Sequence, residues 1–346
     1  MATIFDILNT IRDNASVTYQ DRVPEATRTN IEDIRFAMLE GADNVVVSNE
    51  FMGTLINMLI KQVVHNKLFE NPLKSLKKGK KPTGDTVQEI YNNFLKGETF
   101  DSAKAGSELL SRKLPDTKSV YHRMNRKDLY EITVGREELA KAFRSFESLD
   151  SYIQNLINTL YNSAELDEYL HTKQLIQSAI NKNAIVVKTF DKADDPCVKG
   201  VDGKEFISLV KSVSGLMEFP STEFNAYTLA QSVDTKPLTT FSKKSEQILI
   251  LDVITDTKLN VVDLANIFNM SVAEFNETKK IVIDRFPDPT IRGALVDEKF
   301  FQIYDDQFTV ESFRNPKGLY TNYYLHVWET LAYSILVNAV VFKVAE

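Results

Sequence analysis

The residue types that most often perform catalysis or bind metals are few in this sequence and follow no known spacing. The four histidines are His65, His122, His171 and His326. They have no metal-ligand spacing relative to one another or to acidic residues, so we interpret them as isolated surface or core side chains. The sequence also has no Gly-x-Ser-x-Gly elbow and no His-Glu-x-x-His motif. We therefore predict no catalytic residues, no metal site and no cofactor.

Two further patterns resemble ion or phosphate sites but are incomplete. One is an acidic cluster of Asp191, Asp194 and Asp195. Ala193 and Pro196 stand where a calcium loop needs an oxygen ligand and a glycine, so we predict a solvated loop here. The Gly-Lys pairs at 79–80 and 203–204 lack the preceding glycine and the following Ser or Thr of a phosphate-binding loop. Neither pattern therefore predicts a ligand.

A run of lysines is the strongest candidate for a functional segment. It consists of Lys74, Lys77, Lys78, Lys80 and Lys81. Prolines and glycines within the run and beside it break any helix. Two interpretations stay open: a solvated charged loop, or a basic loop that contacts an acidic surface of a partner. Because the segment has few apolar residues, we expect it to contribute to assembly between subunits rather than to folding.

The composition indicates a soluble globular protein with a real core. The chain has 346 residues, of which 43% are apolar and 26% charged. A formal net charge of −7 argues against a protein that holds nucleic acid by its phosphates. The single cysteine, Cys197, excludes an internal disulfide and indicates a reducing compartment. We expect neither a signal peptide at the N-terminus nor a membrane span, because polar residues interrupt the most apolar window at 45–64.

The longest uninterrupted helical pattern lies between Gly135 and Pro196, where there is neither glycine nor proline. Its apolar stripe consists of Leu139, Phe143, Phe146, Leu149, Ile153, Leu156, Leu160 and Ala164. This spacing predicts an amphipathic spine helix over 136–182. Asn162 with Glu165 could cap a second helix, so two consecutive helices are equally compatible with the pattern.

The other predicted elements surround this spine. We predict helices at 1–13 and at 49–64, the second capped by Ser48, with an extended polar arm at 14–44 between them. Residues 70–134 form one long excursion that ends in strands at 118–123 and 129–134. Later helices begin at Asn260 and Ser271. The later strands are predicted at 185–190, 248–254, 280–283, 294–296, 300–304, 310–313 and 320–342, with a turn at 315–318.

Four stretches of the sequence resemble one known family. They are Gly293–Asp305 followed by Arg314-Asn315-Pro316-Lys317-Gly318-Leu319-Tyr320-Thr321-Asn322-Tyr323-Tyr324-Leu325-His326-Val327-Trp328, then Asn71–Gly79, Leu160–Tyr169, and Phe268-Asn269-Met270. Their order and spacing are similar to those of the major capsid proteins of small short-tailed phages, the phi29-like (Picovirinae) group. Thr321 and the pair Leu336-Val337 depart from the family pattern at packing positions. Some members carry a C-terminal immunoglobulin-like domain, which we do not expect here.

The resemblance implies the α+β tailed-phage (Hong Kong 97-like) capsid fold. Its parts would be an N-terminal arm and first helix (1–69), an extended loop with peripheral strands (70–134), a spine helix region of the peripheral domain (135–185), an axial domain (186–284) and peripheral-domain strands (285–346). The implied function is a structural, non-enzymatic major capsid protein of the virion that assembles into hexamers and pentamers. The negative net charge agrees with this function, because a shell that is not basic repels packaged DNA and lets it slide in and out.

The implied partners are other copies of the chain, a scaffolding protein during assembly and a portal or connector at one vertex. The head would be icosahedral or prolate, would assemble in the host bacterial cytoplasm, and would enclose double-stranded DNA without sequence-specific binding or a membrane. Five lysines, Lys74, Lys77, Lys78, Lys80 and Lys81, are the candidates for contacts between subunits. The alternatives are a soluble α+β enzyme with dispersed catalytic residues, and a coiled-coil scaffold on 136–182, for which sustained heptads are missing.

Overall fold

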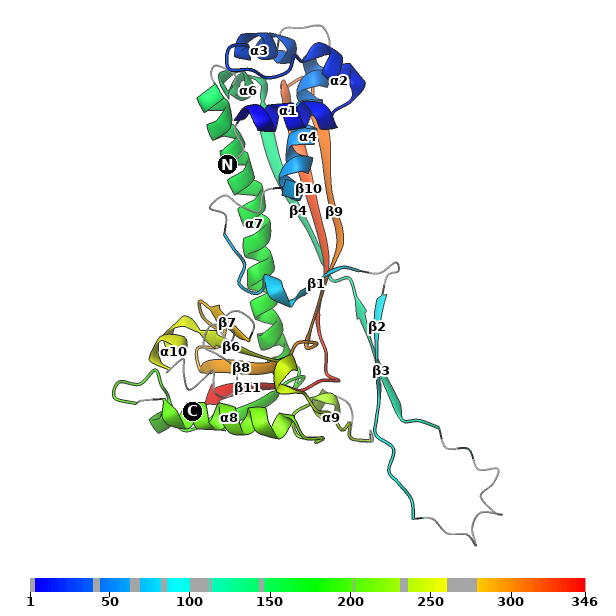
Figure 1. The fold of residues 1–346 in the computed structure, drawn as a ribbon, viewed down its shortest axis with the longest axis vertical. Coiled ribbons are helices and arrows are strands. Elements are labelled where there is room, and N and C mark those ends of the chain that lie inside the picture. Colours follow the sequence, from blue (N-terminus) through cyan, green and yellow to red (C-terminus); the bar gives the residue numbers. More distant parts are fainter. Residues whose placement is uncertain are drawn as a thin grey trace. The chain divides into compact units, whose positions relative to one another are not determined.

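The computed structural model describes residues 4–39, 44–62, 69–81, 86–99, 112, 114–142, 146–201, 203–230, 236–259 and 279–345. The chain divides into two compact units, each with helices and strands (Figure 1). Unit 1 consists of Met1–Asn71, Arg126–Glu168 and Asp306–Glu329, and unit 2 of Pro72–Asn125, Tyr169–Asp305 and Thr330–Glu346. No helix in the described ranges has the length and apolarity needed to cross a membrane.

Unit 1 begins with a set of helices, α1 (Ile4–Asn14), α2 (Val17–Arg22), α3 (Ile31–Leu39) and α4 (Asn44–Gln62). The helix predicted at 1–13 is confirmed by α1, which buries Leu8 and Ile11. Helix α2 begins where the side chain of Ser16 accepts a hydrogen bond from the backbone N–H of Tyr19. This N-cap satisfies one of the donors that the first turn of a helix leaves without a partner.

The extended arm predicted at 14–44 is wrong, because α2 and α3 lie in this segment. Tyr19, Ile34 and Met38 are buried in the apolar core of unit 1. Helices this short are stable only when they pack, and their few apolar residues give no helical stripe in the sequence. The predicted cap Ser48 is also wrong: it lies inside α4, and its hydroxyl donates a hydrogen bond to the Met38 carbonyl at 2.6 Å.

Unit 1 also contains two long antiparallel strands. Strand β4 (Arg126–Gly135) pairs with β10 (Tyr320–Tyr333) from Tyr320 opposite Gly135 to Glu329 opposite Arg126. Alternate residues of β10 are buried in the core, as period-2 side-chain geometry requires, namely Tyr323, Leu325 and Val327. The strands predicted at 300–304 and 310–313 are one strand, β9 (Phe301–Asn315), and a turn follows it as predicted.

The predicted spine is present as two helices, α6 (Arg136–Ala142) and α7 (Phe146–Asn181). The alternative break at Asn162 and Glu165 is wrong, because α7 continues through both residues. The side-chain oxygen of Asn162 instead accepts a hydrogen bond from the backbone N–H of Phe69 at 3.0 Å. The Asn162 side chain therefore has a hydrogen-bond partner outside the helix, and it does not act as an N-cap because no helix begins at this residue.

Unit 2 is built around a five-stranded sheet in the order β5-β11-β8-β6-β7. Its strands are β5 (Val186–Phe190), β6 (Gln247–Asp252), β7 (Lys280–Ile283), β8 (Ile291–Asp297) and β11 (Ala339–Val344). Both faces of the sheet are covered. Leu295 and Val340 pack in one cluster with α8 (Lys204–Met217), whereas Ala294 and Val341 pack in another with the end of α7.

The strands of this sheet come from both sides of the predicted boundary between an axial domain at 186–284 and peripheral-domain strands at 285–346. Strands β8 and β11 belong to the same sheet as β5, β6 and β7. Val340 lies opposite Leu295 in the antiparallel pairing of β11 with β8. Such pairing joins residues far apart in sequence and leaves no local pattern, so the sequence order of the strands did not reveal it.

Local chemistry explains the other differences in unit 2. Strand β6 ends two residues before the predicted 254, because Asp252 accepts a hydrogen bond from the Thr255 N–H at 2.6 Å and caps α10 (Val253–Lys258). The predicted segment 320–342 is two strands, β10 and β11, since residues 334–338 interrupt it. The helices predicted at Asn260 and Ser271 lie outside the described residues.

A separate hairpin completes unit 2. Strand β2 (Thr86–Asn92) pairs antiparallel with β3 (Thr117–Arg123), which confirms the strand predicted at 118–123. The hydroxyl of Tyr91 donates a hydrogen bond to the Thr239 carbonyl at 3.0 Å, and the hydroxyl of Ser334 donates one to Glu89 at 2.6 Å. Strand β2 has no counterpart among the predicted elements, although Val87 and Tyr91 are residue types that favour strands.

Candidate inter-subunit surface

The predicted lysine loop is an ordered segment of unit 2. Residues Lys74–Leu76 form the 3-10 helix η1, and Lys77–Lys80 form strand β1. Strand β1 pairs in parallel with β9, with Lys77 opposite Ile303, and lies at the edge of its sheet. The backbone N–H of Lys81 extends the pairing by donating to the Asp305 carbonyl at 2.9 Å. Three of the five lysines, Lys77, Lys78 and Lys80, therefore lie on an edge strand.

The prediction that this segment does not belong to a core is wrong. Leu73 is 2% exposed and Leu76 is 4% exposed. Both pack in the apolar cluster that contains Phe300, Phe301 and Ile303. Each fully buried leucine contributes roughly 1.5–3 kcal/mol, so two of them are enough to hold a short basic segment in place. The average composition of the segment did not predict this burial, because only its two leucines are buried among otherwise polar residues.

The five lysines differ in their environment. The Lys77 ammonium forms an ion pair with Asp305 at 2.7 Å and is half-buried, so it acts within unit 2. Lys81 is also half-buried. Lys74, Lys78 and Lys80 are exposed, and we call these three the lysine edge.

The backbone of β1 helps to place the lysine edge. The pairing with β9 shifts register between Lys77 and Lys80, and Gly79 adopts a φ of 83°, which favours glycine. Desolvation lowers the pKa of Lys78, although the nearby Glu89 carboxylate partly opposes this effect. The irregularity of the strand therefore lies between Lys77 and Lys80, within the part of β1 that carries Lys78.

The histidines and acidic residues that the structure describes do not form a metal site. His122 is buried in the hairpin, with Nε2 3.1 Å from the Glu89 carboxylate. Asp195, predicted to lie in a solvated loop, is buried and bonded to Arg292, with Nε to Oδ1 at 2.8 Å and Nη2 to Oδ2 at 2.9 Å. The described part of the chain contains no group of three metal-ligating side chains. The part of the prediction that treats Asp195 as solvated is thus wrong, because Arg292 neutralises it in the interior.

Paired carboxylates make the stability of unit 2 sensitive to acid. Burial raises the pKa of Asp195 and Asp288, but hydrogen bonds from Arg292 to Asp195 and from Thr290 to Asp288 outweigh it. The pKa of both carboxyls therefore lies below the usual 3.8. Since the unfolded chain binds more protons in this range, stability is lost as the pH falls through the lowered pKa values.

We expect Asp195→Asn to flatten this acid dependence. The variant lacks the titrating carboxylate, so its free energy of unfolding should be lower than that of the wild type at neutral pH. The difference should shrink as the pH falls below 3.8. Urea denaturation from pH 2 to pH 7 measures both quantities. A constant difference over the whole range would contradict the proposed contribution of the ionised Asp195.

Unit 1 contains a buried polar network that the sequence analysis did not predict. Arg126 donates hydrogen bonds to Glu329 at 2.6 Å, to Asp128 at 2.5 Å and to the Tyr130 hydroxyl at 3.0 Å. Tyr130 in turn donates to Asp167 of α7 at 2.8 Å. Burial lowers the pKa of Arg126, but Glu329 and Asp128 more than offset it and hold the guanidinium charged. The network therefore links β4, β10 and α7 within unit 1.

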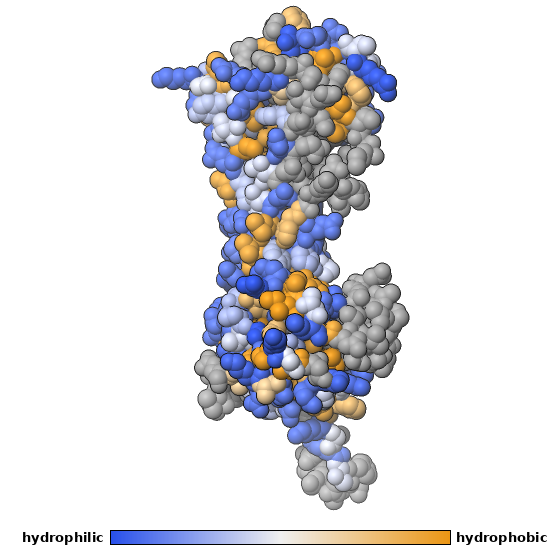
Figure 2. All heavy atoms as spheres, turned by 90° about the vertical axis from the view of Figure 1, so that its left-hand side faces the viewer, coloured by the Kyte–Doolittle hydropathy of each residue, from blue (hydrophilic) through white to orange (hydrophobic). Residues whose placement is uncertain are grey.

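The surface outside these sites is mixed. On the side displayed in Figure 2, hydrophobic side chains are scattered among hydrophilic ones. The large apolar side chains exposed in the described ranges include Phe219 and Leu216 of unit 2 and Phe313 of unit 1. Single exposed apolar residues are common on monomers, so they do not by themselves mark an interface.

A family model and individual relatives both match this chain, and they name the same family. The family described as "Phi29-like phage major capsid protein" matches residues 8–343. The major capsid protein of Bacillus phage GA-1 is 32% identical over 341 residues, which cover 98% of this chain and 69% of that protein. The major capsid protein of Bacillus phage PZA is 33% identical over 342 residues, which cover 98% and 72%.

The fold agrees with these relatives. A chain in the capsid structure of Staphylococcus phage Andhra matches with a TM-score of 0.65 and 12% sequence identity, over 83% of this chain and 87% of that chain. This likeness confirms the predicted α+β tailed-phage (Hong Kong 97-like) capsid fold.

Proposed function

Because this chain belongs to the phi29-like phage major capsid protein family, we propose that its copies assemble as hexamers and pentamers into a closed head around double-stranded DNA. The protein is a structural major capsid protein rather than an enzyme, and its place is the capsid shell of the virion. The predicted alternative of a soluble enzyme is therefore set aside. Self-association into a shell agrees with the fold neighbours, which are parts of assembled capsids.

We also propose three other partners for the shell. A scaffolding protein acts during assembly in the host bacterial cytoplasm, and a portal or connector occupies one vertex. The DNA is enclosed without sequence-specific binding. The net charge of −7 supports weak attachment of the shell to the DNA backbone, because a shell that is not basic gains little from neutralising phosphates.

The lysine edge is one surface through which subunits bind each other in this proposal. The observation that carries it is the exposure of Lys74 in η1 and of Lys78 and Lys80 on edge strand β1, directly after two leucines that are fixed in the core. An anchored strand presents its charges with little loss of backbone entropy on binding. The partner surface is an acidic region of a neighbouring copy, which an acidic chain can readily supply.

The hairpin of β2 and β3 is a second such surface. Ile90 and Tyr121 are both exposed, and their strands run antiparallel with Ile90 opposite Ser119 and Gln88 opposite Tyr121. The opposite face holds Glu89 and His122, which are bonded to each other. The hairpin is thus fixed on one face and open on the other, as the extended loop of this fold would need in order to contact a neighbour.

Reversing the charge of the lysine edge tests the proposal. We expect the wild-type chain, expressed with and without a scaffolding protein, to form closed particles in negative-stain micrographs. The triple variant Lys74→Glu, Lys78→Glu and Lys80→Glu should remain folded, since exposed charges contribute only about 0–1 kcal/mol each. It should form few closed particles, because repulsion recurs at every copy, and added salt should restore part of the yield.

A matched control carries the same change of charge elsewhere. Lys182, Lys192 and Lys199 are also exposed, and their replacement by Glu should leave the particle yield closer to wild type. A normal yield from the lysine-edge variant at low ionic strength would refute the contact and leave the solvated-segment interpretation. Wild-type chain that never forms closed particles under either condition would refute the proposal of a self-assembling head.

A further inference from the structure

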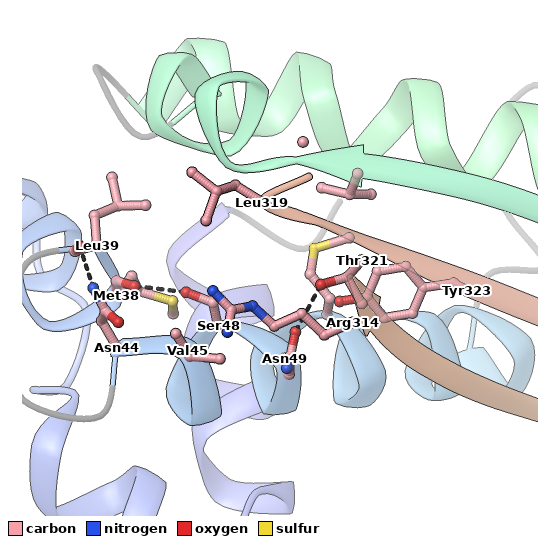
Figure 3. Close-up of a pocket in the computed structure, with 13 residues that line it drawn as sticks. Met38, Leu39, Asn44, Val45, Ser48, Asn49, Arg314, Leu319, Thr321 and Tyr323 are labelled. Atoms are coloured by element: carbon pink, nitrogen blue, oxygen red, sulfur yellow. Dashed lines mark hydrogen bonds between the residues drawn. The ribbon is translucent and has the colours of Figure 1, made fainter. Parts of the chain in front are cut away.

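A small cavity in unit 1 contains an arginine that has no acidic partner among the described residues. The cavity has a volume of about 50 Å³ and is lined by residues of α3, α4, β4, β9 and β10 and by Leu319 of the turn between β9 and β10. By the measure in which one water needs roughly 10–15 Å³, it has room for a group of a few heavy atoms. Figure 3 shows the Arg314 side chain extending from β9 toward Ser48 and Asn49 of α4.

The described neighbours of Arg314 do not compensate its charge. Its guanidinium forms no hydrogen bond or ion pair with any described residue, and the side chain is half-buried. The cavity wall offers polar groups but no carboxylate: Ser48 already donates to the Met38 carbonyl, and Asn49 accepts a hydrogen bond from Thr321 at 3.0 Å. The Asn49 amide nitrogen donates to no described residue, so it too is available to an acceptor.

Five other partly buried cations in the described part of the chain have acidic partners, whereas Arg12 donates to the carbonyls of Val23 and Gln20. The pairs are Arg126 with Glu329, Arg292 with Asp195, Lys173 with Asp284, Lys280 with Asp256 and Lys343 with Asp288. Arg314 differs from these five because it lines a cavity and has no acidic partner within the described ranges. Partial burial of a charge without a partner has an unfavourable desolvation energy. The attraction between the guanidinium and a bound anion would offset this energy.

We propose that this cavity, the Arg314 pocket, binds a carboxylate side chain of a second copy of the chain. The guanidinium is a planar fork of donors that matches a carboxylate with two parallel hydrogen bonds. The chain carries 48 acidic residues against 41 basic ones, so its copies offer a surplus of carboxylates. The pocket deepens the proposed function, on which the choice of a second copy as the source rests.

The turn between β9 and β10 holds the pocket in shape. Its Asn315 side-chain oxygen accepts hydrogen bonds from the backbone N–H groups of Lys317 and Gly318, both at 3.0 Å. The Asn315 amide also donates to the Tyr320 hydroxyl at 2.8 Å. This fixed turn sets the start of β10 and thereby the position of Thr321 beside Asn49. The carboxylate would therefore meet donors that are already placed, which lowers the entropy lost on binding.

Arginine modification of the unassembled chain tests the pocket without requiring assembly. Phenylglyoxal reacts with free guanidinium groups, and mass spectrometry of peptides gives the rate at each arginine. We expect acetate, compared with chloride at equal ionic strength, to slow the reaction of Arg314, about twofold when half the pockets are filled. Arg123 is exposed on β3 and serves as the internal control, with no change expected. Equal rates for Arg314 in acetate and chloride, or slowing by inorganic phosphate alone, would overturn the carboxylate site.

Modification of assembled particles tests the source of the carboxylate. Arg314 should be protected in particles relative to the unassembled chain, whereas Arg123 reports general loss of access. In Arg314→Gln, the unassembled chain should unfold at the wild-type urea concentration, but its particles should dissociate at a lower one. Acetate protection without protection in particles would overturn the second copy as the occupant while leaving the proposed shell intact. Absence of wild-type particles would instead refute the proposed function, and the acetate result would still decide the pocket.

Discussion

Arg126→Ala is expected to lower the free energy of unfolding by roughly 3–5 kcal/mol. The side chains of Arg126 and Glu329 are 4% and 1% exposed, and the two are joined at 2.6 Å. Removal of the guanidinium leaves the Glu329 carboxylate charged in the interior without its ion-pair partner. Asp128 and the Tyr130 hydroxyl lose a donor in the same step. The cost thus comes mainly from the groups left behind, not from the pair itself.

Urea denaturation followed by far-UV circular dichroism measures this loss. Arg123→Ala is the matched control, because the residue is exposed and should change stability by less than about 0.5 kcal/mol. The double variant Arg126→Met with Glu329→Leu removes both charges and should regain most of the stability, since apolar replacements of a buried pair are often neutral. A loss below about 1 kcal/mol for Arg126→Ala would show that water or a rearranged side chain compensates Glu329.

Phe342→Ala is expected to cost about 3–5 kcal/mol by leaving a cavity in unit 2. Phe342 is fully buried on β11, and its ring meets that of Phe206 edge to face, with centroids 5.7 Å apart. Phe206 in turn contacts Phe190 at 5.3 Å, so three elements, β11, α8 and β5, meet at these rings. Close packing prevents the neighbours from filling the space completely.

The same denaturation experiment checks this value. Phe313→Ala is the control of identical chemistry, because Phe313 is 70% exposed and should change the stability little. Phe342→Leu should lie between the wild type and the alanine variant, since it retains much of the volume. A loss for Phe342→Ala no larger than that for Phe313→Ala would mean that the aromatic cluster is not packed as described.

Local patterns in the sequence predicted the elements that depend on local chemistry. Helix α1 and strand β7 match their predicted ranges closely, because an apolar stripe or a short β-branched run is visible over a few residues. Helices α2 and α3 were missed for the opposite reason: their burial depends on packing against α4, which no window of the sequence contains.

The same limit applies to the candidate surfaces. The five lysines stand out by composition, but only the structure separates Lys77, which pairs with Asp305, from the exposed Lys78 and Lys80. The Arg314 pocket has no sequence signal at all, because its wall comes from five elements spread over both ends of the chain. Only tertiary packing determines which residues line the same cavity.

The order of strands in unit 2 has a consequence for synthesis on the ribosome. Strand β5 pairs with β11 in the five-stranded sheet, yet β11 is made about 150 residues later. At about 5–20 residues per second, the nascent β5 waits roughly 8–30 s for this neighbour. During that interval β6 and β8 can already pair, but the apolar surface that β11 later covers stays open to chaperones. Unit 2 is therefore completed late, so a partly translated chain cannot present the finished sheet to a growing shell.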